Sequence, residues 1–126
     1  MISKPVLIVD DEAIVRESIR DWLKEDGYDV ATAESGEEAL EMMAKQDFGV
    51  IVLDIRLLGK SGIQVLKEVK AVKPQIKSII ISAYPSTELA AEAMKLGAVD
   101  YLIKPVAPDD LERLIQETLL KCENEQ

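Results

Sequence analysis

Short apolar runs alternate with amphipathic stretches along the whole chain. The three strongest runs each lead directly into polar residues: Pro5–Val9 into Asp10-Asp11, Gly49–Leu53 into Asp54, and Ser78–Ile81 into Ser82. Strands that are buried on both faces have this composition, which is typical of parallel sheets. Two weaker runs, Asp29–Ala33 and Val99–Ile103, complete a set of five predicted strands.

Apolar residues at helical spacing lie between these runs and predict five helices. In the first, Val15, Ile19 and Leu23 recur with charged residues between them, and Gly27 follows as the expected C-terminal cap. The other helices have similar signals: a start after Ser35, a stop at Pro74, a close at Gly97 and a start at Pro108.

Five strand–helix units joined by short connections predict an α/β fold. Parallel strands need crossover helices, and such crossovers are right-handed. We therefore expect a flavodoxin-like, doubly wound, five-stranded parallel sheet in the order 2-1-3-4-5. The sequence predicts one domain over residues 1–126, with its core at about 4–120. The polar segment 121–126 is either a natural end or the start of a linker.

Polar side chains follow four of the five predicted strands. In an open α/β sheet the ligand site lies beyond the carboxyl ends of the strands, so Asp10, Asp11, Asp54, Ser82 and Lys104 should converge there. Two carboxylates about 4 Å apart repel by on the order of 4 kcal/mol at an effective dielectric of 20. Either a positive charge offsets that repulsion or the pKa of a carboxyl group rises, and Mg²⁺ and Lys104 are the natural candidates for the positive charge.

Each of these residues also has an ordinary structural interpretation. Asp11 and Glu12 suit a helix N-terminus, Asp54 can begin a loop, Ser82 can cap a helix, and Lys104 can be a solvated charge. Their joint occurrence at the ends of apolar runs favours a functional site.

Composition and charge narrow the possible functions. The formal net charge of -9 disfavours direct binding of this segment to nucleic acid. The single cysteine, Cys122, cannot form an internal disulfide, which predicts a reduced, cytoplasmic protein. No apolar run is long enough to predict a membrane span or a secretory signal.

The polar set also carries a family resemblance. Asp10-Asp11, Asp54, Ser82-Ala83 and Lys104-Pro105, together with the loop 54–62, resemble the receiver domains of two-component response regulators. The resemblance extends from about residue 4 to residue 120. It implies a signalling switch in which a histidine kinase or phosphotransfer protein phosphorylates Asp54 with the help of Mg²⁺.

The resemblance implies a role for each matching residue. Asp11, Asp54 and the Arg56 main-chain carbonyl would hold Mg²⁺, with Asp10 reaching it directly or through water. Lys104 would pair with one phosphoryl oxygen, and the Ser82 hydroxyl would hydrogen-bond another after phosphorylation. Tyr101 would be the aromatic switch that turns inward in response.

Three positions are expected to modulate the reaction. The family usually has proline where this chain has Leu58, so we expect a more mobile loop and an altered phosphorylation rate. Arg56 and Tyr84 occupy positions that influence phosphoryl lifetime in the family. The bulk of Tyr84 leads to the hypothesis that it shields the site from water.

Output in such domains runs through the fourth helix, fifth strand and fifth helix, as a homodimer contact or a partner-binding surface. A C-terminal output domain outside this chain, such as that of a transcription regulator, is one expectation, and a single-domain receiver is the other. A phosphatase that uses an aspartyl phosphate needs a second Asp where Arg56 stands, so we expect no enzyme acting on an external substrate. The remaining alternative is a phosphate-independent interaction module with the same fold.

Overall fold

Strands and helices alternate along the chain. The computed structural model describes residues 4–57, 60–84 and 86–124. The elements are β1 (Val6–Val9), α1 (Ala13–Glu25), β2 (Val30–Ala33), α2 (Gly36–Lys45), β3 (Val50–Asp54), α3 (Gly62–Val72), β4 (Lys77–Ser82), α4 (Thr87–Lys95), β5 (Asp100–Ile103) and α5 (Pro108–Asn124).

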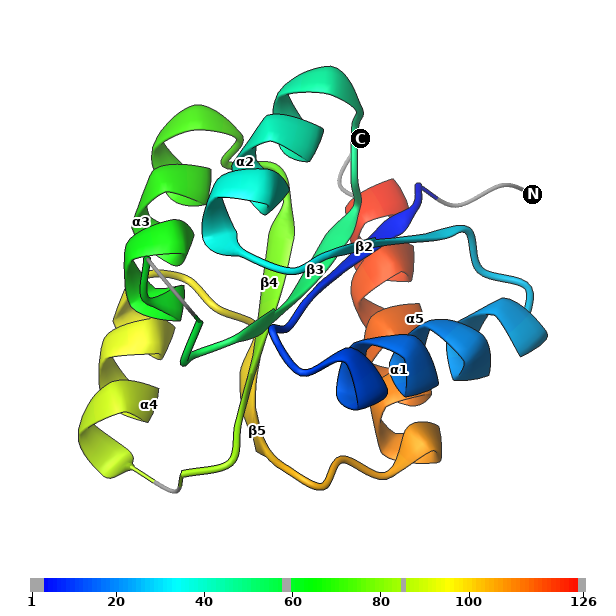
Figure 1. Cartoon of the computed structure of the whole chain (residues 1–126). Coiled ribbons are helices and arrows are strands. Elements are labelled where there is room, and N and C mark those ends of the chain that lie inside the picture. Colours follow the sequence, from blue (N-terminus) through cyan, green and yellow to red (C-terminus); the bar gives the residue numbers. More distant parts are fainter. Residues whose placement is uncertain (1–3, 58–59, 85, 125–126) are drawn as a thin grey trace.

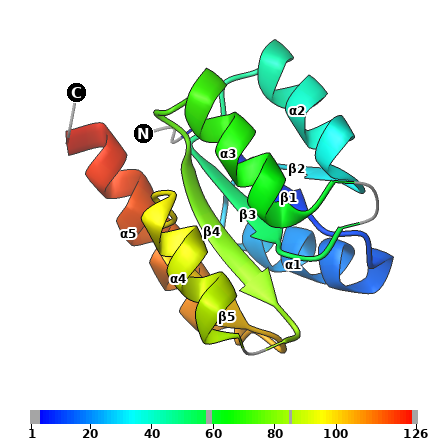
Figure 2. The same cartoon turned by 90° about the vertical axis from the view of Figure 1, so that its left-hand side faces the viewer.

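All five strands are parallel and form one sheet in the order β2-β1-β3-β4-β5. Helices α1 and α5 cover one face of the sheet, and α2, α3 and α4 cover the other (Figure 1). Figure 2, turned by 90°, shows α4, β5 and α5 along the same side of the molecule. The predicted flavodoxin-like fold is confirmed.

The two faces of the sheet explain the continuous apolar runs. Leu7 and Val9 point into a core with α2, α3 and α4, whereas Val6 and Ile8 point into a second core with α1 and α5. All four side chains are fully buried. Successive residues of a strand face opposite sides, so both sets must be apolar.

Local signals set most helix ends. The Ser35 hydroxyl accepts a hydrogen bond from the Glu38 amide at the start of α2, and Gly27 and Gly97 take positive φ angles of 92° and 94° after α1 and α4. Helix α5 continues to Asn124, past the expected end of the core at residue 120. The predicted polar segment thus begins within the last turns of this helix.

Candidate functional site

The carboxyl ends of β1, β3, β4 and β5 bring the predicted polar residues to one edge of the sheet. Asp54 and Ser82 are the last residues of β3 and β4, and Asp10 and Lys104 directly follow β1 and β5. Asp54 is paired with Ile81 in the sheet, so Ser82 lies beside the end of β3. Asp10, Asp54 and Ser82 are all buried.

Lys104 is the centre of the charged cluster. Its Nζ lies 2.8 Å from Asp10 Oδ2, 2.9 Å from Asp54 Oδ2 and 3.0 Å from Glu12 Oε1. The side chains of Lys104, Asp10 and Asp54 are only 11%, 0% and 6% exposed, whereas that of Glu12 is 62% exposed. Lys104 therefore holds two buried carboxylates and one solvated carboxylate together.

Burial and charge act in opposite directions on these groups. Burial raises the pKa of the Asp10 carboxyl, and the opposing effect of the Lys104 ammonium does not cancel it. Burial also works against the charged form of Lys104, but its three carboxylate partners outweigh burial and raise its pKa. The cluster thus contains one carboxylate whose charge is only partly compensated.

The donor set fits a magnesium ion. Asp10, Glu12 and Asp54 each offer a carboxylate oxygen, and these oxygens lie within 4.8 Å of one another. Among the described residues, buried Asp10 Oδ2 accepts no hydrogen bond of regular geometry, although Lys104 lies at ion-pair distance. Such an oxygen has a lone pair left for a cation. Hard, oxygen-only ligands are those that Mg²⁺ prefers.

The three clustered carboxylates are not the three that the sequence predicted, because Glu12 stands in the place of Asp11. Asp11 was expected beside the metal, but it is half-buried and is not among the three clustered carboxylates. Glu12 was overlooked as a possible ligand. It is the third acid in a row and the N-cap of α1, yet its side chain makes no capping hydrogen bond and instead contacts Lys104.

The hydroxyl groups expected to act as a switch share one acceptor. Ser82 Oγ donates to the Tyr84 carbonyl at 3.2 Å and accepts from the Tyr84 amide at 3.0 Å. The Tyr101 hydroxyl donates to the same carbonyl at 3.1 Å.

The Arg56 guanidinium lies 3.9 Å from the centroid of the Tyr84 ring, in the range of a cation–π contact. Leu58 lies outside the described residues.

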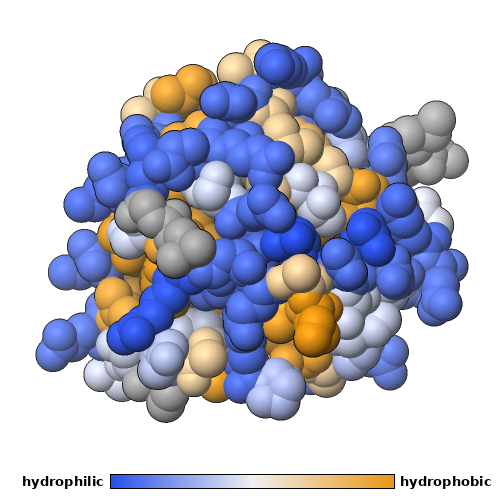
Figure 3. Space-filling view, viewed as in Figure 1, coloured by the Kyte–Doolittle hydropathy of each residue, from blue (hydrophilic) through white to orange (hydrophobic). Residues whose placement is uncertain are grey.

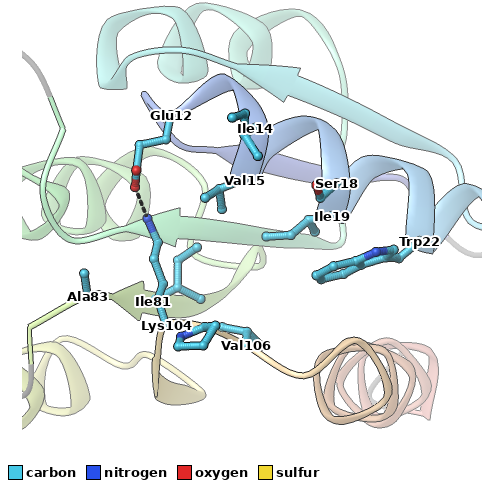
Figure 4. A pocket seen from close by; sticks show the side chains of 11 residues that line it. Glu12, Ile14, Val15, Ser18, Ile19, Trp22, Ile81, Ala83, Lys104 and Val106 are labelled. Atoms are coloured by element: carbon cyan, nitrogen blue, oxygen red, sulfur yellow. Dashed lines mark hydrogen bonds and ion pairs between the residues drawn. The ribbon is translucent and has the colours of Figure 1, made fainter.

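A cavity of about 390 Å³ adjoins the charged cluster. Figure 4 shows Glu12 and Lys104 at one end and Trp22 at the other. The lining is mostly apolar and comes from α1, the end of β4 and the segment after β5. At its rim Ile14 is 82% exposed, and Figure 3 shows a hydrophobic area amid hydrophilic surface near the start of α1.

This fold and this edge of polar residues define a class of signalling domain. The family model described as the response regulator receiver domain matches residues 6–116. The chain belongs to the family of response regulator receiver domains.

Curated relatives and solved structures agree with this assignment. The chain is 42% identical over 118 residues to the transcriptional regulatory protein ZraR of Escherichia coli (strain K12), covering 90% of this chain and 26% of ZraR. It is 39% identical over 106 residues to the alginate biosynthesis transcriptional regulatory protein AlgB of Pseudomonas aeruginosa, covering 84% and 24%. The chain thus spans about a quarter of these relatives.

The structure is similar to solved receiver domains. A CheY-like response regulator receiver domain protein from Methanospirillum hungatei JF-1 superposes with a TM-score of 0.94 at 32% identity, covering 98% of this chain and 99% of that one. NtrX from Brucella abortus gives a TM-score of 0.91 at 28% identity, covering 98% and 28%. Within the described part of the chain, no helix has the length and apolar character needed to cross a membrane.

Proposed function

We propose that this receiver domain accepts a phosphoryl group on Asp54 from a histidine kinase or phosphotransfer protein. The observation that supports this most directly is the position of the Asp54 carboxylate. Its Oδ2 pairs with Lys104 at 2.9 Å, its Oδ1 accepts from the Arg56 amide at 3.0 Å, and its side chain is 6% exposed. A carboxylate oriented by two donors is suited to attack at a defined angle.

The covalent change is small. An Asp54 oxygen forms a bond to phosphorus while the bond from phosphorus to the donor imidazole nitrogen breaks, and the electron pair leaves with the imidazole. When bound by Asp10, Asp54 and Glu12, Mg²⁺ would neutralise negative charge on the phosphoryl oxygens. Asp11 and the Arg56 carbonyl are the further ligands that the family resemblance implies. Lys104 would stabilise a phosphoryl oxygen, as phosphoryl transfer requires mainly positioning and charge stabilisation.

The proposed switch begins at Ser82. A phosphoryl group on Asp54 offers new acceptor oxygens, and the Ser82 hydroxyl would leave the Tyr84 carbonyl to bond one of them. The Tyr101 hydroxyl now bonds that same carbonyl. Movement of the Tyr84 segment would therefore change the environment of Tyr101 on β5.

The proposed output surface is formed by α4, β5 and α5. Each of these elements carries an exposed large apolar residue: Met94, Ile103 and Leu120. Such residues support a contact with a second copy of the chain or with a partner. By likeness to ZraR and AlgB, which are transcriptional regulators, that partner is proposed to be a C-terminal output domain.

The cavity beside α1 supports docking of the phosphoryl donor. Ile14 and the apolar lining lie next to Lys104, so a partner seated there would approach the charged cluster. A cytoplasmic location, where the donor would meet this domain, is part of the same proposal.

The test is phosphorylation by a small donor. Wild-type protein and the variants Asp54→Ala and Asp47→Asn are incubated with acetyl phosphate, with and without Mg²⁺, and their intact masses are measured. Asp47 is an exposed carboxylate that pairs with Lys73 at 3.8 Å, so its replacement controls for unspecific phosphorylation of surface carboxylates. We expect one added phosphoryl group in wild type and Asp47→Asn, only with Mg²⁺, and none in Asp54→Ala. Absence of the gain in folded wild type would favour the phosphate-independent interaction module.

A further inference from the structure

Arg16 is buried, although its position between the apolar residues of α1 is one where solvent-exposed charged residues are expected. It lies in the first turn of α1 and is only 8% exposed. Its Nη1 donates a buried hydrogen bond to the main-chain carbonyl of Asp10 at 2.8 Å. Its Nη2 lies 3.5 Å from Glu34 Oε1, and the Glu34 side chain is 76% exposed.

The Glu34 pair does not explain why this guanidinium is buried. Removing a charge from water is costly unless it is well paired, and a long contact to an exposed carboxylate contributes little. The short contact is with Asp10, the residue that begins the carboxylate group of the site. The position of Arg16 is therefore better explained by the site than by the ion pair.

Asp10 is fixed at three points. Its amide donates to the Ala33 carbonyl at 3.2 Å, its carbonyl accepts from Arg16, and its Oδ1 accepts from the Glu12 amide at 2.9 Å. These contacts leave Oδ2 facing Lys104. Helix α1 has no side-chain N-cap, so Arg16 is the side chain of its first turn that ties the helix back to the end of β1.

We infer that Arg16 is a positioning residue for the metal site. It holds the peptide plane after Asp10, so that the carboxylates of Asp10 and Glu12 point at the same space, and it adds a fixed positive charge behind them. Lys104 is the cation that must turn to the phosphoryl group, whereas Arg16 stays in place. This inference rests on the proposed function in that the site is taken to bind Mg²⁺.

The test measures Mg²⁺ binding without any phosphoryl donor. Wild type, Arg16→Met, Arg16→Lys and the control Arg20→Met are titrated with Mg²⁺ while the NMR shifts of the Glu12 and Arg56 amides are followed. These amides donate to Asp10 and Asp54 and so report the site itself. Arg20 is on the same helix, is partly exposed and pairs with the neighbouring Asp21. Thermal melts accompany each titration.

We expect Arg16→Met to weaken Mg²⁺ binding by about 10- to 100-fold, as losses of outer-sphere partners do. Arg16→Lys should lie between it and wild type, and Arg20→Met should match wild type. A lower melting temperature with unchanged Mg²⁺ affinity in folded Arg16→Met and Arg16→Lys would overturn the inference and leave a structural role only. If the wild-type amides do not respond to Mg²⁺ at all, the metal site of the proposed function fails as well.

Discussion

The carboxyl group of Asp10 is fully buried, which makes its charged form unfavourable. Burial raises the pKa of its carboxyl despite the Lys104 ion pair. A folded state that holds a proton more tightly than the unfolded chain loses stability as pH rises through the raised pKa. The ionised Asp10 thus reduces fold stability while providing an oxygen for a cation.

We therefore predict that Asp10→Asn raises the free energy of unfolding at pH 7 in metal-free buffer and weakens Mg²⁺ binding. Lys104 keeps Asp54 and Glu12 as partners, so the substitution leaves no unpaired buried cation. Denaturant unfolding measures the effect. The gain should shrink as pH falls toward the ordinary carboxyl value of about 3.9, because both states of the wild type then bind the proton. A loss of stability at pH 7 would contradict this view of the cluster.

The Tyr84 ring is the other residue-scale feature with a direct consequence. Its contact with Arg56 is of a kind worth about 0.5–1 kcal/mol at an exposed site, which corresponds to roughly two- to fivefold in a rate. We predict that Arg56→Gln shortens the phosphoryl lifetime by about that factor and that Tyr84→Ala shortens it at least as much, because water then reaches the site. Tyr84→Phe, which keeps the ring, should behave as wild type. The measurement is loss of phosphorylated protein over time, and an unchanged lifetime in Tyr84→Ala would refute the shielding hypothesis.

At the scale of elements, the start of α3 depends on a close backbone approach. The Gly62 amide donates to the Ile55 carbonyl at 2.8 Å, and a Cβ at Gly62 would clash with the Asp54 carbonyl and lie 2.6 Å from Ile55 Cα. We predict that Gly62→Ala costs about 1–3 kcal/mol of stability. Because the clash is with the backbone of Asp54, phosphorylation should slow as well. Gln64→Ala, an exposed change in the same helix, should alter neither quantity by a comparable amount.

A hydrogen bond joins the segment between α1 and β2 to helix α5. The hydroxyl of Tyr28, after α1, donates to Glu112 Oε2 at 2.7 Å. Burial, and then the Glu112 carboxylate, raise the pKa of this phenol. Below about pH 10 the donor is present and the bond stabilises the fold, and the stabilisation is lost as pH rises through the raised pKa.

We predict that Tyr28→Phe lowers the free energy of unfolding at pH 7 by about 1 kcal/mol. Glu112→Gln keeps an acceptor and should cost less. Tyrosinate absorbance gives a second measurement, since wild type should contain a phenol that ionises above the ordinary tyrosine pKa and Tyr28→Phe should lack it. If wild type and Tyr28→Phe do not differ in this way, the hydrogen bond is not made in solution.

Element patterns predicted the fold well because apolar runs and helix-ending residues act locally. The same patterns did not predict which side chains point toward the site. Asp10, Asp11 and Glu12 are consecutive acids, and only the turn geometry after β1 decides that Glu12, rather than Asp11, joins the cluster. Arg16 has the spacing of a solvated charge and is buried because its side chain folds back onto Asp10. Both depend on backbone direction, which residue types alone do not specify.

For the molecule as a whole, phosphorylation is expected to change self-association. The exposed Ile103 on β5 is 44% accessible and lies next to Lys104. We predict that phosphorylation shifts the protein toward a dimer and that Ile103→Glu prevents this without preventing phosphorylation. Val72→Glu, at an apolar position on α3 that is 69% exposed, serves as the control. Light scattering after size-exclusion chromatography decides the matter, and a dimer that persists in Ile103→Glu would place the contact elsewhere.

In the proposed function the phosphoryl group resides on Asp54. Borohydride reduces an aspartyl phosphate to homoserine, so treating the phosphorylated protein and mapping its peptides by mass spectrometry locates the acyl phosphate. We expect homoserine at position 54 alone, and only in samples phosphorylated with Mg²⁺ present. Homoserine at Asp10, Asp11 or another carboxylate, or none in a sample that carries phosphate, would contradict it.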